Sequence, residues 1–83
     1  MHYVYLIEGR DGARYVGCTK QLKLRIDQHN AGISPHTSKF RPWRLAAYIG
    51  FPTEAQALAF EKYLKQGSGH AFARRHFWTK PDE

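Results

Sequence analysis

Tyr3-Val4-Tyr5-Leu6-Ile7 stands almost at the start of this chain, and Arg14-Tyr15-Val16-Gly17-Cys18 follows after a short interruption. Both runs are rich in aromatic and β-branched residues, which favour strands. Between them, Arg10-Asp11-Gly12 predicts a three-residue hairpin loop, because Gly12 can adopt the left-handed conformation that the third loop position requires. The chain is therefore expected to begin with an antiparallel hairpin.

The length of this loop decides which residues of the hairpin face each other. With three residues in the loop, Ile7 lies opposite Tyr15 and Tyr5 lies opposite Gly17. Opposed residues point to the same face, so Tyr5 and Tyr15 become diagonal neighbours, about 7–8 Å apart at the backbone. Gly17 has no side chain, and we expect open space over the Tyr5 ring. A two-residue turn would instead put the tyrosines on opposite faces, and in the plainer interpretation both are packing residues.

Length and charge limit the class of protein. Eighty-three residues make one domain with a small core. Thirteen Lys and Arg against seven Asp and Glu give a net charge of +6, which suits a polyanion such as nucleic acid. The single cysteine, Cys18, excludes an internal disulfide and agrees with a reducing cytoplasm. No apolar run is long enough to span a membrane, so we expect a soluble, cytoplasmic protein.

The first predicted helix spans Lys20 to Ala31, with Thr19 as its N-cap and Gly32 at its end. Its inward stripe consists of Leu22, Arg25, Ile26 and His29. Arg25 and His29 thus stand where an amphipathic helix normally carries aliphatic residues. The alternative is that both lie at the edge of the stripe with their polar ends in water.

The middle of the chain is predicted as a basic loop followed by a third strand. Ile33 to Pro42 contains two prolines and several hydroxyl residues, which argue against regular structure. Lys39 and Arg41 in this loop are candidate phosphate contacts. Trp43 to Gly50 has the alternation of a strand, with Leu45, Ala47 and Ile49 on one side.

The second predicted helix begins at Pro52-Thr53, where Thr53 to Gln56 has the form of a capping box, and ends at Gly67-Ser68-Gly69. Its buried stripe contains one carboxylate, Glu61, which is costly to bury unless it is paired or binds a metal. The alternative is that Glu61 lies at the edge of the stripe and forms an ion pair with a neighbouring cation. His70 to Phe77 is predicted as a third helix, on which Arg74 and Arg75 either contact nucleic acid or are solvated. Trp78 to Glu83 is predicted as a loose tail.

Together these polar residues in core positions supply the groups that cut a phosphodiester. A carboxylate such as Glu61 can hold one Mg²⁺ or Mn²⁺ ion, with water completing the coordination, and a single candidate carboxylate favours a one-metal mechanism. The Arg25 guanidinium can bind the scissile phosphate and stabilise its developing charge. Tyr5 or His29 can take the proton of the attacking water, and the sequence does not decide between them. We favour Tyr5, with His29 orienting either Tyr5 or the water. Arg25 and a bound cation are expected to lower the pKa of the Tyr5 phenol.

The chain resembles the GIY-YIG nuclease domain. Tyr3-Val4-Tyr5 matches the first motif of that family and Tyr15-Val16-Gly17 the second, with Tyr3 in place of glycine and Val16 in place of isoleucine. Arg25, His29 and Glu61 follow in the right order. The resemblance implies an α+β fold, with a three-stranded antiparallel sheet flanked by about three helices, over residues 1–78, and a short tail at 79–83.

The resemblance also implies metal-dependent cleavage of DNA. Tyr5 and Tyr15 match the motif tyrosines, Arg25 the phosphate-binding arginine and Glu61 the metal-binding glutamate, while His29 matches a histidine that assists proton transfer. The chain is similar to small stand-alone bacterial members related to the nuclease domain of the excision-repair endonuclease. This implies a role in DNA repair or recombination, with a protein partner supplying the targeting. The alternatives are a non-catalytic nucleic-acid-binding module of the same fold and a basic protein that binds ribosomal RNA or another protein.

Overall fold

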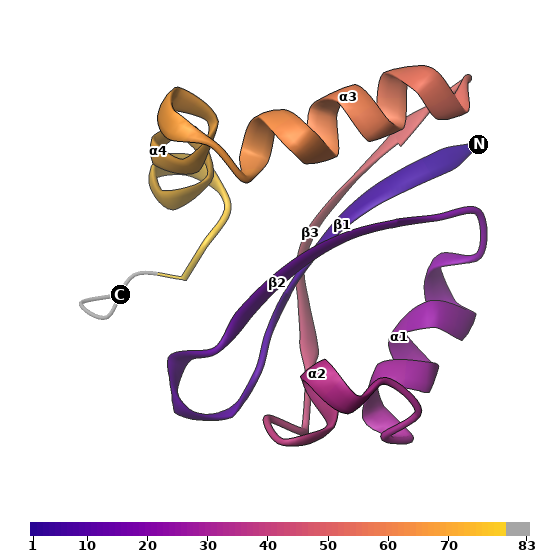
Figure 1. The fold of residues 1–83 in the computed structure, drawn as a ribbon, viewed down its shortest axis with the longest axis vertical. Coiled ribbons are helices and arrows are strands. Elements are labelled where there is room, and N and C mark those ends of the chain that lie inside the picture. Colours follow the sequence, from indigo (N-terminus) through magenta and orange to yellow (C-terminus); the bar gives the residue numbers. More distant parts are fainter. Residues whose placement is uncertain (80–83) are drawn as a thin grey trace.

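The computed structural model describes residues 1–79, which form a three-stranded antiparallel sheet with helices on both faces (Figure 1). This confirms the predicted α+β class. In chain order the elements are β1 (His2–Glu8), a 3₁₀ turn (Arg10–Gly12), β2 (Arg14–Thr19), α1 (Leu22–Asn30), α2 (Pro35–Ser38), β3 (Arg44–Phe51), α3 (Glu54–Leu64) and α4 (Gly67–His76). None of the helices in this described part is long and apolar enough to cross a membrane.

The predicted register of the hairpin is confirmed. Tyr5 pairs with Gly17 and Ile7 pairs with Tyr15 across β1 and β2. The Tyr5 and Tyr15 rings lie on the same face, with their centroids 6.2 Å apart. The three-residue loop therefore places the two motif tyrosines side by side, as its length requires.

The hairpin loop uses two left-handed residues where we predicted one. Gly12 has φ 75°, as expected, but Asp11 also has φ 62°. Aspartate tolerates this conformation better than most residues because its short polar side chain can form local hydrogen bonds. The Gly9 amide donates to the Ala13 carbonyl at 2.8 Å and closes the loop.

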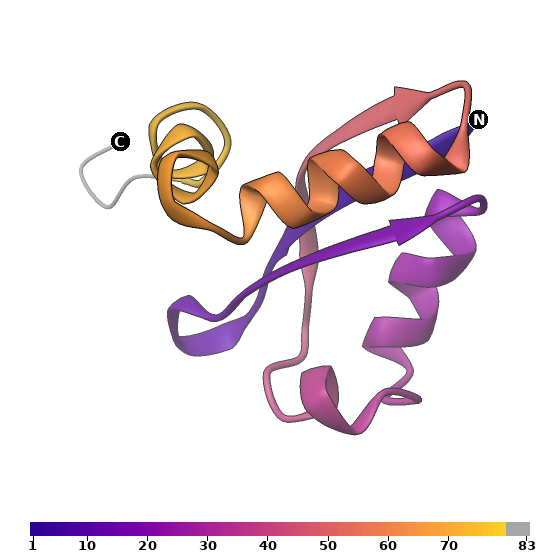
Figure 2. The same ribbon diagram turned by 45° about the horizontal axis from the view of Figure 1, so that its top comes forward.

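The central strand β1 separates two apolar clusters. The strand order is β2-β1-β3, so β1 has a neighbour on each side, and its residues Val4 to Ile7 are all buried. Alternate residues of a strand point to opposite faces. Val4 and Leu6 pack under α3 and α4, whereas Tyr5 and Ile7 pack with residues of α1 on the other face. Figure 2 shows α3 and α1 on the two sides of the sheet.

Helix α1 begins two residues later than predicted, at Leu22. Thr19 is the last residue of β2 and not an N-cap, although its hydroxyl accepts a hydrogen bond from the Gln21 amide at 3.0 Å. The predicted end is confirmed, because Gly32 follows the helix with φ 81°. Of the predicted stripe, His29 is fully buried and Arg25 is partly buried.

The loop between α1 and β3 is more ordered than predicted. Pro35–Ser38 forms a short helix, α2, with proline in its first turn, where the missing amide hydrogen costs nothing. Strand β3 also departs from simple alternation. Leu6 pairs with Ala47, but Ile7 pairs with Leu45, so Ala46 is an extra residue at a bulge. Beyond this bulge Leu45 is 39% exposed instead of buried.

The two C-terminal helices begin with different signals. The Thr53 hydroxyl caps α3 by accepting a hydrogen bond from the Gln56 amide at 3.2 Å, as predicted. The predicted break at Gly67-Ser68-Gly69 is wrong in its extent, because these residues form the first turn of α4. Gly69 is needed there for packing: a Cβ at this position would collide with the Tyr63 carbonyl at the end of α3.

The prediction of a loose tail from Trp78 is wrong for its first two residues. Trp78 is only 7% exposed and belongs to the core cluster under α3 and α4. The Thr79 amide and hydroxyl both donate to the Glu8 carboxylate at 2.8 Å, and Arg44 donates to it at 3.0 Å. Residues 80–83 of the predicted tail 79–83 lie outside the described residues.

We expect Glu8→Gln to destabilise the protein by about 1–2 kcal/mol, because an amide cannot replace the charge-assisted hydrogen bonds to Arg44 and Thr79. Urea unfolding at neutral pH measures this loss. Asp27→Asn is the matched control, since Asp27 forms only a surface ion pair with Lys23 at 3.2 Å and its removal should cost less than about 0.5 kcal/mol. Equal losses in the two variants would contradict a special role for Glu8.

Candidate active site

A chain of buried hydrogen bonds joins β1, α1 and α2. The Tyr5 hydroxyl and the Nε2 atom of His29 are 2.8 Å apart, and the Nδ1 atom of His29 is 2.8 Å from the Thr37 hydroxyl. Tyr5 is 1% exposed, His29 0% and Thr37 1%. Both ring nitrogens of His29 thus have a partner, which fixes the orientation of the imidazole. Within residues 1–79 no buried side-chain nitrogen or oxygen is left without a hydrogen bond.

Aromatic rings form the walls around this hydrogen-bonded chain. The Tyr15 ring meets the His29 ring edge-on, with 5.0 Å between centroids. The Trp43 ring lies 6.4 Å from His29 and 6.5 Å from Tyr15, and its indole nitrogen donates to the Thr37 carbonyl at 2.7 Å. This packing holds the three polar side chains of Tyr5, His29 and Thr37 in one arrangement.

The open space expected over the Tyr5 ring is not present. The Tyr5 hydroxyl itself occupies the room beside Gly17, and a Cβ at position 17 would collide with it. Glycine is needed here because the phenol must pass over the backbone of β2 to reach His29. Gly17 therefore makes room for the Tyr5 side chain itself, and the predicted space for a water or phosphate above the ring is wrong.

Burial determines the acidity of Tyr5. Loss of water around the phenol raises its pKa from 10.0 to about 12, and Tyr15 and Glu61 add to the rise, while the Arg25 guanidinium opposes it. The predicted lowering by Arg25 is confirmed, but desolvation outweighs it, so the pKa of Tyr5 in the protein alone is raised instead of lowered. Tyr5 is therefore a protonated phenol at neutral pH.

Burial also keeps His29 neutral. Desolvation lowers the pKa of the imidazole below its ordinary value near 6.5, and the nearby Arg25 charge lowers it further. In a neutral imidazole one nitrogen donates a hydrogen bond and the other accepts one. His29 can accordingly accept a hydrogen bond from one neighbour, Tyr5 or Thr37, and donate one to the other.

We expect the His29 ring to remain neutral at pH 6.5 and to titrate only at lower pH. In the unfolded chain the imidazole takes up a proton near pH 6.5, whereas in the folded protein it does so only at lower pH. The contribution of His29 to the free energy of unfolding is therefore complete above pH 6.5. It decreases as the pH is lowered from 6.5, by up to about 1.4 kcal/mol per pH unit. The NMR shift of the His29 ring Cε1 proton, followed from pH 8 to 4.5, measures the titration directly. A midpoint at or above pH 6.5 would contradict the effect of burial.

Arg25 and Glu61 approach the tyrosines from opposite faces of the sheet. Arg25 lies on α1 and donates to the Gln28 amide oxygen at 3.1 Å. Glu61 lies on α3, and its side chain is 19% exposed and paired with Lys65 at 2.9 Å. Both charges act on the Tyr5 phenol. Helix α3 covers the other face of the sheet, but it also packs against the edge strand β2, which brings Glu61 close enough to affect the Tyr5 pKa. The structure thus brings all five predicted catalytic side chains to the region of β2.

The chemistry of Glu61 suits a single Mg²⁺ or Mn²⁺ ion. Magnesium is usually held by one or two carboxylates, with water and substrate phosphates completing its shell. Within residues 1–79 no group of three or more His, Cys, Asp and Glu side chains forms a ready-made metal cage. Glu61 is a partly buried carboxylate, and its ion-pair partner Lys65 is exposed. If the ion pair between them opens, Glu61 can bind one cation that a substrate phosphate also binds.

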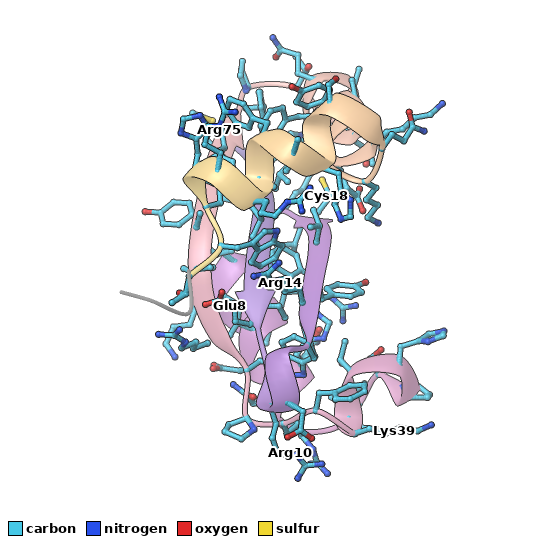
Figure 3. All side chains as sticks on the ribbon, turned by 90° about the vertical axis from the view of Figure 1, so that its left-hand side faces the viewer. Glu8, Arg10, Arg14, Cys18, Lys39 and Arg75 are labelled. Atoms are coloured by element: carbon cyan, nitrogen blue, oxygen red, sulfur yellow. The ribbon has the colours of Figure 1, made fainter. Side chains whose placement is uncertain are left out.

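The four predicted phosphate contacts do not lie together. Lys39 and Arg41 follow α2, whereas Arg74 and Arg75 are exposed on α4. Figure 3 shows Arg75 near one end of the molecule and Lys39 near the other. Arg10, which the sequence analysis did not select, joins the Lys39 end by donating to the Lys39 carbonyl at 2.6 Å.

The family model of the GIY-YIG catalytic domain matches residues 1–75. The chain belongs to this family. A GIY-YIG catalytic domain is a nuclease domain, and DNA is the substrate that such a domain implies. This confirms the resemblance on which the sequence analysis relied.

Relatives of the chain are small GIY-YIG proteins named UPF0213. The UPF0213 protein BH0048 of Halalkalibacterium halodurans is 37% identical over 65 residues, covering 77% of this chain and 69% of that protein. The UPF0213 protein VNG_2274C of Halobacterium salinarum is 36% identical over 67 residues, covering 80% and 87%. The solution NMR structure of BH0048 from Bacillus halodurans matches with a TM-score of 0.55 at 34% identity, over 88% of this chain and 79% of that one.

Sequence reasoning missed one member of the buried hydrogen-bonded chain, Thr37. The chain offers no periodic signal for it, because Thr37 lies in a segment that was predicted as an irregular loop. The buried bond to Nδ1 of His29 becomes visible only once α2 is placed beside α1. Asn30 was also undervalued: its side chain accepts from the Trp43 amide at 2.6 Å and donates to the Trp43 carbonyl at 2.9 Å, which ties α1 to the start of β3.

Proposed function

We propose that this protein is a metal-dependent endonuclease that hydrolyses DNA phosphodiester bonds. The observation that carries the proposal is the 2.8 Å contact between the Tyr5 hydroxyl and Nε2 of His29, beside Tyr15 and within reach of the Arg25 charge. A buried phenol needs a hydrogen-bond partner, and here the partner is an imidazole that is able to accept the phenol's proton. A tyrosine and a histidine in hydrogen-bond contact can move a proton in general acid–base catalysis.

In the proposed mechanism Tyr5 and His29 act as a relay. The attacking water gives a proton to the Tyr5 oxygen, and Tyr5 passes its own hydroxyl proton to Nε2 of His29, which becomes an imidazolium. The Nδ1–H group donates to the Thr37 hydroxyl and holds the tautomer in which Nε2 can accept. A relay avoids a free phenolate, which a pKa of about 12 disfavours. It also combines the two candidate bases that the sequence left open.

The remaining two groups act on the phosphate. Arg25 binds the scissile phosphate and stabilises the negative charge that grows on its oxygens. Glu61 would hold one Mg²⁺ or Mn²⁺, and such an ion supplies Lewis-acid stabilisation of the phosphate and of the leaving oxygen. For Glu61 to bind a cation, Lys65 has to leave the 2.9 Å ion pair that it now forms.

A non-catalytic nucleic-acid-binding module remains the second candidate, and one observation favours it. Tyr5 and His29 are almost completely covered, so a substrate water can reach the Tyr5 hydroxyl only if the neighbouring side chains move. Purified protein incubated with branched, nicked and linear DNA, in Mg²⁺ and in EDTA, separates the two candidates. Cleavage that requires Mg²⁺ supports the endonuclease, and binding without cleavage in Mg²⁺ and in Mn²⁺ supports the module.

We expect weak DNA binding that depends on salt and little on sequence, because the proposed contacts of Lys39, Arg41, Arg74 and Arg75 go to phosphates. Each contact removed should reduce the slope of log K against log[salt] by about 0.9 on duplex DNA. DNA titrations at several salt concentrations measure this slope for two double variants, Lys39→Gln with Arg41→Gln and Arg74→Gln with Arg75→Gln. Each double variant tests one end of the molecule. Tight binding to one sequence that salt leaves unchanged would contradict this mode.

The biological setting belongs to the same proposal. We infer a cytoplasmic enzyme of DNA repair or recombination, acting as one catalytic domain over residues 1–78 with a protein partner that supplies targeting. The support is the net charge of +6, which suits a nucleic-acid substrate without indicating any particular sequence. Co-purification from cells treated with a DNA-damaging agent tests for that partner.

A further inference from the structure

A cavity of about 270 Å³ lies at the outer edge of β2, between that strand and the two C-terminal helices. Its lining combines three basic side chains, two aromatic ones and two aliphatic ones. They are Arg14, Lys65 and His70, then Tyr15 and Trp78, and finally Val16 and Leu64. Basic groups beside an apolar surface are the combination that recognises a nucleotide, since the phosphate needs cations and the base needs an apolar or aromatic contact.

The basic side chains come from three separate elements. Arg14 lies on β2, Lys65 directly follows α3, and His70 lies on the first part of α4. The Arg14 guanidinium lies over the Trp78 ring, 5.2 Å from its centroid, and this cation–π contact favours a position beside the cavity for an otherwise exposed side chain. Figure 3 shows Arg14 on the strand beneath α4.

The cavity adjoins the candidate active site at two residues. Tyr15 is among the residues that line the cavity, while its ring contacts His29 on the α1 face of the sheet. Lys65 lines the cavity and pairs with Glu61, which lies one helical turn earlier on α3. A strand whose scissile phosphate is held between Arg25 and Glu61 would therefore pass this cavity with a neighbouring nucleotide.

We propose that this cavity is a subsite for one unpaired nucleotide of the DNA strand, next to the phosphate that is cut. Its volume is slightly below the ~300 Å³ at which typical small-ligand pockets begin, which suits a single nucleotide. The base lies against Val16 and the small exposed edge of Trp78, and its phosphate is bound by the basic rim. Such a base must leave the double helix, so the subsite selects DNA with an unpaired nucleotide at the cleavage point. This specificity rests on the proposed endonuclease function.

Nucleotide binding in EDTA tests the subsite without requiring cleavage. In an assigned ¹H–¹⁵N spectrum, deoxyadenosine 5′-monophosphate should shift the Trp78 indole signal and leave the Trp43 indole signal unchanged, because Trp43 is buried on the other face. Inorganic phosphate and deoxyadenosine should each bind at least about tenfold more weakly than the nucleotide, because each keeps only part of the contacts. No shift at Trp78, or equal binding of inorganic phosphate, overturns the nucleotide subsite.

Two variants and a control complete the experiment. Arg14→Gln should weaken nucleotide binding by about tenfold, the effect of one charge-assisted hydrogen bond, and His70→Gln by about fivefold, the effect of one neutral hydrogen bond. Lys62→Gln removes a positive charge from the exposed surface of α3, outside this cavity, and should change binding by less than about twofold. Loss of Arg14 could also move Trp78, which it contacts. His70 is exposed, so its substitution should not disturb the core, and the His70→Gln result tests the subsite independently. Equal weakening by all three variants overturns the subsite, whereas failure of the wild type to cut DNA would refute only the proposed endonuclease.

Discussion

Tyr5→Phe is expected to cleave DNA at least ~10²-fold more slowly than the wild type, because the relay loses the atom that receives the proton of water. The ring and its packing beside Gly17 remain, so the fold should be preserved. The variant leaves one nitrogen of the buried His29 ring without its partner, which should cost about 1–2 kcal/mol of stability. Single-turnover cleavage with saturating Mg²⁺ and DNA measures the rate, and urea unfolding measures the stability.

Tyr48→Phe is the matched control for this change. Tyr48 is the direct partner of Tyr5 on β3, but it is 55% exposed and has no role in the proposed chemistry. Its rate should stay within about twofold of the wild type. A Tyr5→Phe variant that retains activity within about tenfold would show that this hydroxyl does not carry the proton.

Glu61→Gln should reduce cleavage by ~10³-fold or more, while DNA binding is kept. The amide has nearly the same shape but no charge with which to hold a divalent cation, and metal catalysis contributes several kcal/mol. Binding of DNA should persist or rise slightly, because a negative charge near the phosphate is removed. Cleavage at a series of Mg²⁺ concentrations, together with DNA titrations in EDTA, separates the two effects.

The control for Glu61 lies on the same helix. Glu54 is an exposed carboxylate in the first turn of α3, and Glu54→Gln should leave the cleavage rate within about twofold of the wild type. If Glu61→Gln cut DNA as fast as Glu54→Gln at saturating Mg²⁺, Glu61 would not be the metal ligand.

The parts of the fold that depend on local chemistry could be predicted from the sequence. The hairpin register follows from the number of loop residues and from the left-handed Gly12, so the meeting of Tyr5 and Tyr15 was predictable. The cap at Thr53 is local in the same way. The stripe positions of His29 and Glu61 also follow from helical spacing and from the cost of burying a polar group among apolar ones.

Features that depend on contacts between distant segments were not predictable. Thr37 binds His29 only because α2 folds against α1, and Trp78 is ordered only because α3 and α4 leave an apolar surface for it. The first turn of α4 contains glycines that normally end a helix, but Gly69 is required by its contact with Tyr63. The net shift of the Tyr5 pKa was not predictable because burial cannot be weighed against Arg25 before the core is known.

Cleavage of a branched DNA by the wild-type protein, in Mg²⁺ and in EDTA with Glu61→Gln in parallel, tests the central claim most directly. We predict products that form only in Mg²⁺, only with the wild type, and from the branched DNA faster than from a linear duplex. Binding of every DNA without any product, in Mg²⁺ and in Mn²⁺, would contradict the account and leave the protein as a nucleic-acid-binding module.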